Sequence, residues 1–473
     1  MVSATALLSL GQAQENPAPT SSFVSWLEQD YMLGDWGGLR TTLSKHGVDF
    51  EFFYAGSLPD NLEGGNRRGT LYQGGLLMTL DLDSQKLVGY EGGTFHASSL
   101  WLHGEKPFST FADGSPNYVG DLNKVNLLDF PNAARLWELW YQQKLLEGKV
   151  TIKAGELSID RDFIVPEYYN TLGSFTLINQ TFLYPTLAFN VYDIAGLPPL
   201  HHGLASTPNA VPGVLLRFEP LRQVYGQAAV YGGDPDQTYS GTRFNLSETE
   251  GALAYFEVGY HLNQGTNDTG LEGAYKVGGY YHTGDFPDAY EGTFIALDNK
   301  LLALGQTPLG IYPALQTRGG NYGLYFLAEQ QLFREKDKTD PAKQGLVGFF
   351  RLAEAPGDRN LTQLGVDGGL VYKGLIPSRD WDTLAVGASY LQMSDDIANA
   401  QRDINALVTS LGGTPVFNKL ADYEGVLEIS YKAQLTAWWT LQPSLQRVFH
   451  PGGHLSADIP DAWVFILQTT LRF

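Results

Sequence analysis

Charged and polar side chains recur at every second position along several segments of the sequence. In residues 134–145, Glu138, Trp140, Gln142 and Lys144 share one face, opposite Leu139. Arginine and lysine donate hydrogen bonds and carboxylates accept them, so such a face can bind a polar solute reversibly. The other candidates are Arg67, Asp81, Lys153, Arg217, Glu257, Glu329 and Arg351 on polar faces, and Arg135, which is out of phase with Glu138 and is expected near a strand end.

The sequence offers little for catalysis or for a cofactor. It has no cysteine, no phosphate-binding loop and no dinucleotide fingerprint. Its nine histidines show no metal-binding spacing, and the adjacent His201 and His202 have no partner ligand nearby. A glycosidase pair of carboxylates can be neither located nor excluded among so many acidic residues. We therefore expect no enzyme activity, no cofactor and no metal site.

Alternation with a period of two predicts that these faces belong to β-strands. In 252–262, Ala254, Phe256 and Val258 lie opposite Glu257. The segments approach the ~9–11 residues that a tilted strand needs to cross a membrane, and there are roughly sixteen or a few more. They are 49–56, 76–83, 93–103, 134–145, 149–157, 213–219, 223–231, 252–262, 273–282, 321–333, 345–353, 365–373, 382–393, 423–432, 437–449 and 463–473.

Aromatic residues and connector lengths favour a membrane barrel over a soluble sandwich, which alternates in the same way. Many apolar faces have an aromatic residue near one end, as an interfacial girdle requires. Connectors alternate between short turns, such as 146–149, and long polar loops, such as 104–132, 283–318 and 394–420. No run of ~18 apolar residues occurs, so only a closed barrel could span a bilayer. The candidate girdle residues are Trp101, Tyr141, Tyr260, Tyr372 and Trp463.

Composition agrees with this fold class and disfavours nucleic acid as a partner. Aromatic residues make up 13% of the chain and there are 54 glycines, as expected for strands with aromatic girdles and tight turns. The net charge of −20 disfavours nucleic acid as a partner, because a nucleic-acid surface requires basic residues. The sequence thus predicts an all-β, transmembrane, antiparallel barrel.

Three regions are expected along the chain. Residues 1–22 are interpreted as a signal-peptide remnant and a flexible lead-in, with a plain disordered tail as the alternative. Residues 23–47 are predicted to be helical, with a second helix over 36–46 that Gly47 ends. Residues 48–473 are predicted to form the barrel.

The block Leu33–Arg40 (LGDWGGLR), followed by a short helix and Gly47, resembles the N-terminal signature of carbohydrate-selective porins of the OprB type. The resemblance is densest over 30–200. Further matching blocks are Arg67-Arg68-Gly69, Arg135 to Gln143, Gly155-Glu156-Leu157, Asp160 with Phe163, and Ile178 to Phe182; Glu156 and Leu183 depart from the family pattern.

The resemblance implies a barrel of about sixteen strands, a periplasmic N-terminal helix and passive diffusion of sugars such as glucose across the outer membrane of a Gram-negative bacterium. It adds Glu156, Asp160 and Arg161 to the pore-lining and sugar-binding candidates, the last two in a possible inward loop. Trp140 could stack on a pyranose ring or simply fill a gap against the wall.

The expected partners are sugar solutes, outer-membrane lipid and lipopolysaccharide, and the assembly machinery that reads a terminal strand ending in Phe473. That strand is predicted to pair with the segment at 49–56 and so close the wall. Two other functions stay open: a general or anion-tuned porin of the same fold, and a secreted β-rich glycan-binding protein or hydrolase.

Overall fold

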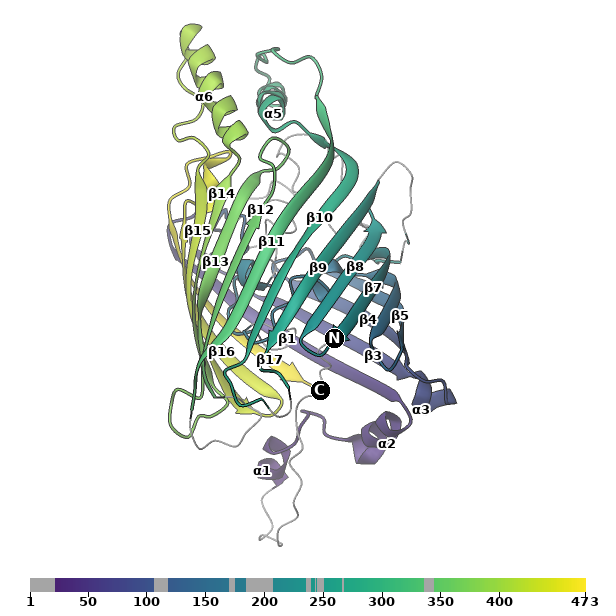
Figure 1. The fold of residues 1–473 in the computed structure, drawn as a ribbon. Coiled ribbons are helices and arrows are strands. Elements are labelled where there is room, and N and C mark those ends of the chain that lie inside the picture. The colour runs from purple at the N-terminus through teal and green to yellow at the C-terminus, as the bar shows by residue number, and fades with distance from the viewer. Residues whose placement is uncertain are drawn as a thin grey trace.

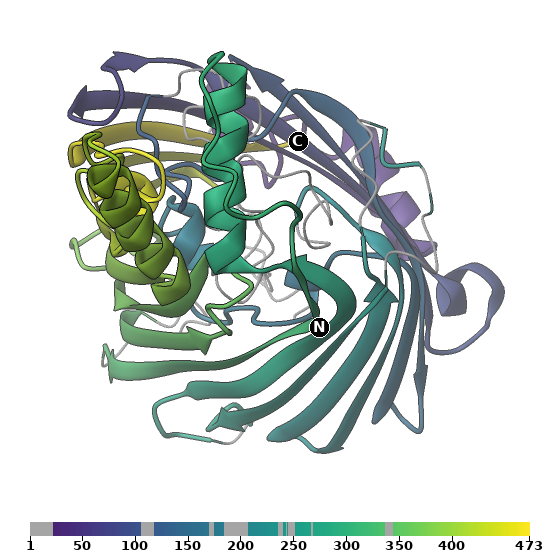
Figure 2. The ribbon, with the colours of Figure 1, turned by 90° about the horizontal axis from the view of Figure 1, so that it is seen from above.

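The computed structural model describes residues 22–105, 118–169, 175–183, 207–234, 240–242, 244, 251–265, 268–335 and 344–473. They form one antiparallel sheet that closes into a barrel (Figures 1 and 2). The strands are β1 (Val48–Glu63), β2 (Gly69–Thr70), β3 (Gln73–Asp83), β4 (Gly93–Gly104), β5 (Ala133–Leu145), β6 (Val150–Leu157), β7 (Val211–Leu221), β8 (Val224–Gly232), β9 (Ala252–Leu262), β10 (Gly273–Pro287), β11 (Thr317–Arg334), β12 (Gly345–Glu354), β13 (Thr362–Lys373), β14 (Thr383–Met393), β15 (Tyr423–Thr436), β16 (Trp439–Phe449) and β17 (Ala462–Arg472).

The two-residue β2 pairs with β1 just beyond β3, which pairs with the earlier part of β1. Because β2 and β3 pair with the same side of β1, the 17 strands occupy sixteen strand positions around the barrel. β17 pairs with β1, for example Phe465 with Asp60, and this pairing closes the wall. The predicted fold class and the pairing of the last strand with the first are therefore confirmed.

The two faces of the wall differ as the alternation predicted. On β9, Phe256 and Val258 are exposed on the outer surface, whereas Tyr255 and Glu257 are buried inside. Trp101, Tyr141 and Tyr260 are exposed outside. An apolar outer band with aromatic side chains suits contact with lipid.

Helices lie at both ends of the barrel (Figure 1). At one end lie α1 (Ser22–Leu27), the 3₁₀ turn η1 (Trp36–Gly38), α2 (Leu39–Lys45) and α3 (Ser84–Val88). At the other end α5 (Ala289–Ala303) and α6 (Asp395–Ser410) stand above the rim. The remaining described helices are short, and they are η2 (Ile159–Arg161), α4 (Gln180–Leu183) and η4 (Pro451–His454). None of the helices in these described ranges is long and apolar enough to cross a membrane.

The second N-terminal helix is shorter than the predicted 36–46, because Trp36–Gly38 forms a separate 3₁₀ turn with Gly37 at a φ of 68°. Gly47 follows this helix at a φ of 88°, where a side chain would meet Asp83 O, so its predicted role as the stop is confirmed. Arg40 fastens α2 to the barrel by donating to the carbonyls of Phe50 and Phe473 at 2.9 and 2.6 Å.

The connectors 283–318 and 394–420 were predicted only as long polar loops, and the structure shows that they contain the helices α5 and α6. Side chains cap both helices. Asp288 accepts from Glu291 N, and Ser394 accepts from Asp396 N and Ile397 N. Such caps satisfy backbone donors that a helix leaves unpaired at its start.

Candidate functional site

Three chain segments fold into the barrel and contact the inward faces of its strands. We call residues 118–130, 158–169 and 175–183 the inner segments. Many of their residues are fully buried, including Val119, Asp121, Leu177 and Ile178. A buried backbone must find hydrogen-bond partners inside the protein. The wall strands provide them, and these contacts define the interior.

Glutamates of the wall accept hydrogen bonds from backbone N–H groups of the inner segments. Glu329 on β11 accepts from Glu167 N and Tyr168 N, both at 2.8 Å. Glu257 on β9 accepts from Ile164 N at 2.9 Å and from two tyrosine hydroxyls. Both carboxylates were predicted to face the interior, and both are buried there as supports of an inner segment.

Two more glutamates, on β15, have the same role and were absent from the predicted site set. Glu424 accepts from Leu122 N and Asn123 N, each at 2.7 Å. Glu428 accepts from Ile178 N at 2.7 Å and Asn179 N at 2.9 Å. Leaving a buried N–H group without its acceptor costs about 1–3 kcal/mol. We call Glu257, Glu329, Glu424 and Glu428 the anchor glutamates.

A cluster of rings and charges lies where β3 to β6 face the interior. Trp140 on β5 stacks on His96 of β4, with ring centroids 4.6 Å apart. The Lys153 ammonium lies 4.5 Å from the Trp140 ring centroid and pairs with Asp162 at 2.9 Å. His96 in turn contacts Asp81 at 2.7 Å. Because neighbours occupy its ring, Trp140 packs against the wall instead of offering a free stacking face.

The turn η2 brings Asp160, Arg161 and Asp162 inward, as the sequence predicted. Arg161 lies 3.7 Å from Glu138 of β5, which also accepts from Ser158 N. Asp160 is buried and accepts from the side chains of Ser158 and Thr207. Burial raises the pKa of Asp160, although both hydrogen bonds act to lower it.

Arg217 on β7 is held by neighbours on its own face. Its guanidinium donates to Glu219 at 2.6 Å and to Gln227 at 3.1 Å, and it lies 3.7 Å from the Tyr225 ring centroid. Gln227 also donates to the anchor glutamate Glu257 at 3.0 Å. The predicted residues Arg217 and Glu257 therefore belong to one hydrogen-bond network.

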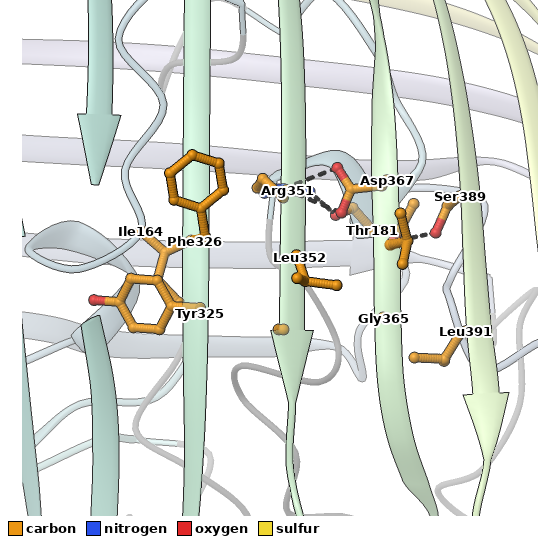
Figure 3. A pocket seen from close by; sticks show the side chains of 12 residues that line it. Ile164, Thr181, Tyr325, Phe326, Arg351, Leu352, Gly365, Asp367, Ser389 and Leu391 are labelled. Atoms are coloured by element: carbon orange, nitrogen blue, oxygen red, sulfur yellow. Dashed lines mark hydrogen bonds and ion pairs between the residues drawn. The ribbon is translucent and has the colours of Figure 1, made fainter. Parts of the chain in front are cut away.

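Arg351 on β12 forms a buried ion pair with the neighbouring strand β13 (Figure 3). Its Nε donates to both carboxylate oxygens of Asp367 on β13, at 2.9 and 3.1 Å, and another nitrogen donates to the Thr181 carbonyl. Thr181 also contacts Ser389 of β14 through its hydroxyl. Arg351 thus holds the inner segment that contains α4 and is not open to solvent.

Glu167 of an inner segment has a lysine and a histidine as close neighbours. Lys276 of β10 approaches it at 2.9 Å and His261 of β9 at 3.0 Å. Burial would raise the pKa of Glu167, but the hydrogen bonds and charges of His261 and Lys276 outweigh it and lower the pKa. Glu167 therefore stays ionised, and its negative charge balances the positive charge of Lys276.

The other predicted residues lie in varied places. Arg67 is exposed on the connection between β1 and β2 and stacks on Tyr118, away from the wall face to which its phase assigned it. Lys144 is exposed at the turn end of β5. The remaining predicted residues are buried on inward faces; they are Arg135, Gln142 and Glu156. Arg135 donates to the side-chain oxygen of Asn209.

Five interior residues with partly exposed side chains stand out from the buried anchors. Asp81 and Glu219 are 43% and 41% exposed, and Arg161 is 33% exposed. We call Asp81, Arg161, Asp162, Arg217 and Glu219 the charged side, and it spans β3, η2 and β7. These groups present both donors and acceptors to a solute.

Sequence reasoning missed Glu424, Glu428, Lys276 and Glu219 as site residues. The signal for most of them was present, because each strand glutamate alternates with outward apolar neighbours, as Glu428 does with Leu427 and Ile429. Also missed was a group at the rim, Asp422, His450 and His454, whose ligand atoms lie within 4.8 Å of one another.

Comparison with known proteins identifies the family. The family described as "Carbohydrate-selective porin, OprB family" matches residues 67–473. The chain belongs to this family. Members of the OprB family are porins, so this chain is a channel and not an enzyme. The match and the closed barrel imply an outer-membrane protein of a Gram-negative bacterium.

Relatives of this OprB-family chain match over nearly their whole length. Porin B of Pseudomonas aeruginosa is 27% identical over 459 residues, which cover 94% of this chain and 91% of that protein. A protein of Acinetobacter baylyi named as the putative porin QuiX is 23% identical, with 94% of each covered. The high-pH structure of Pseudomonas putida OprB superposes with a TM-score of 0.78 at 24% identity, covering 94% of this chain and 99% of that one.

Proposed function

We propose that the protein lets neutral monosaccharides such as glucose diffuse passively across the outer membrane. The supporting observation is that carboxylates pair with several of the interior cations. Lys153 pairs with Asp162, Arg217 with Glu219 and Lys276 with Glu167. Paired charges create little net potential for an anion but still supply hydrogen-bond donors and acceptors to hydroxyl groups.

In this proposal the charged side contacts the sugar and the anchor glutamates keep the inner segments in place. Arg161 and Arg217 donate to sugar oxygens, while Asp81, Asp162 and Glu219 accept from hydroxyls. Contacts with partly exposed groups are weak, and weak binding suits a channel because the solute must leave as easily as it enters. The buried residues Arg351 and Glu329 take no direct part.

Liposome swelling tests the sugar specificity. Purified protein is reconstituted and challenged with isosmotic glucose, a disaccharide and a sugar acid of matched size. The proposal expects glucose to enter fastest, with Arg161→Ala reducing the preference and Lys144→Ala leaving it unchanged. Equal entry of the sugar acid, or a faster one, would support the anion-tuned alternative instead.

We also propose that the terminal strand is read by the outer-membrane assembly machinery, and that lipid and lipopolysaccharide surround the outer face. Phe473 N donates to Phe52 O at 2.9 Å, beyond the last pair of β17 and β1. Deleting Phe473 should reduce the amount of inserted protein more than the conductance of each inserted channel. Outer-membrane yield and single-channel recordings on the same preparation measure the two effects.

A further inference from the structure

We propose that Asp422, His450 and His454 bind a divalent transition-metal ion of the zinc class at the rim of the barrel. Asp422 directly precedes β15, while His450 directly precedes the short turn η4 between β16 and β17 and His454 is the last residue of that turn. The three ligand atoms lie within 4.8 Å of one another. Two imidazoles and one carboxylate form a ligand set that Zn²⁺ commonly accepts, with a fourth position left to water.

The geometry requires only small movements to receive an ion. Asp422 Oδ1 lies 2.9 Å from His454 Nδ1, and Asp422 Oδ2 lies 2.9 Å from His450 Nδ1. Ligands placed ~2.0–2.2 Å from a tetrahedral zinc ion are roughly 3.3 Å apart, so the carboxylate and rings need to separate only slightly. His450 Nδ1 is buried. It lies close to Asp422, but it makes no hydrogen bond to Asp422 or to any other described group.

The backbone around the histidines is held in an unfavourable conformation. His450 and His454 have φ angles of 47° and 57°, the left-handed region that residues with a side chain rarely adopt. Such a conformation persists only where surrounding contacts impose it, and it is concentrated at functional sites. Both imidazoles lie against the same carboxylate.

Neighbouring side chains hold the ligands as an outer shell would. Gln401 of α6 donates to the carbonyls of His454 and Leu455, and it accepts from Ala421 N beside Asp422. Asp458 lies 3.5 Å from the other ring nitrogen of His454, in the position from which carboxylates orient metal-bound imidazoles. The Asp422 and His450 side chains are 39% and 28% exposed, so an ion can reach them from solvent.

The bound ion would connect the chain entering β15 to the β16–β17 connection at the base of α6. The test uses full-length protein in detergent, stripped with a chelator, given Zn²⁺ and dialysed before metal analysis. We expect about one equivalent of zinc per chain, and at least a tenfold loss in Asp422→Asn and in His450→Gln. Asp395→Asn, at an exposed acid on the same rim, and His103→Gln serve as matched controls that should retain the ion.

Folding of each variant is checked by heat-modifiable gel migration. A second measurement needs no variant: electron paramagnetic resonance of Cu²⁺ bound to the wild-type protein. The spectrum should show coupling to two imidazole nitrogens. Three results would overturn the proposal: no zinc retained by folded wild-type protein, equal retention in folded Asp422→Asn, or a copper spectrum without nitrogen coupling.

Discussion

The two sides of the channel interior use the same residue types in different surroundings. The anchor glutamates Glu424 and Glu428 on β15 are fully buried, and their oxygens are occupied by backbone N–H groups. On the charged side, Arg161 and Glu219 are partly exposed and pair with other side chains. A buried carboxylate bonded to backbone amides fixes the path of the chain, whereas a partly exposed ion pair is free to exchange a partner for a solute.

The largest effect is expected where a buried charge would lose its partner. Asp367→Ala leaves Arg351 inside the barrel without its carboxylate, which should destabilise the protein by about 3–5 kcal/mol. The temperature of heat-modified gel migration measures this loss. The double variant Arg351→Leu with Asp367→Leu should recover much of the stability, because no charge is then stranded. A double variant as unstable as the single one would contradict this assignment.

Replacing the carboxyl group of an anchor glutamate should have the next largest effect. Glu428→Gln keeps the size of the side chain but weakens its bonds to Ile178 N and Asn179 N, at a cost of about 1–3 kcal/mol. Single-channel current should become noisier because the inner segment is held less firmly. Glu219→Gln, on the charged side, should cost less than about 1 kcal/mol and leave the current quiet. Equal noise in both variants would remove the distinction between the two sides.

Glucose block and ion selectivity should change most when a residue of the charged side is replaced. Arg161→Ala removes donors and leaves Glu138 without its cation, so glucose should block the current about tenfold less well and the channel should become more selective for cations. Planar-bilayer recordings give both values. A change in ion selectivity without a change in glucose block would mean that Arg161 does not contact the sugar.

A smaller change is expected at Arg217, which shares its contacts with Gln227 and Tyr225. Arg217→Gln should weaken glucose block about two- to fivefold, corresponding to less than about 1 kcal/mol, and should hardly affect stability. Lys144→Ala should alter neither property because its side chain is exposed at the turn end of β5. Sugar block in Lys144→Ala that falls as far as in Arg217→Gln would indicate a general effect of lost positive charge.

Much of the fold could be predicted because strand alternation is a local property. The segment 423–432 shows its inward and outward faces within ten residues, and β15 extends this same segment to Thr436. The helix α6 could also have been predicted. Ser394 is a good cap, and Ile397, Ala400 and Ile404 recur at helical spacing, but the polar composition of the connector concealed this pattern.

Only part of the candidate site could be predicted from the sequence. The phase of β11 predicted that Glu329 faces inward, but its partner Glu167 N is 162 residues away, and no local pattern links them. His450 and His454 are separated by a fixed interval, but Asp422 joins them only when β15 and β16 pair. Roles that depend on such distant contacts emerge only from the folded barrel.

The most direct test of the central claim is the zero-current potential of single channels in a salt gradient, measured while glucose is added. If paired charges line a path for neutral sugars, the potential stays close to zero and glucose lowers the conductance in a saturable way. A strong anion-selective potential that glucose leaves unchanged, with no block of the current, would contradict the account.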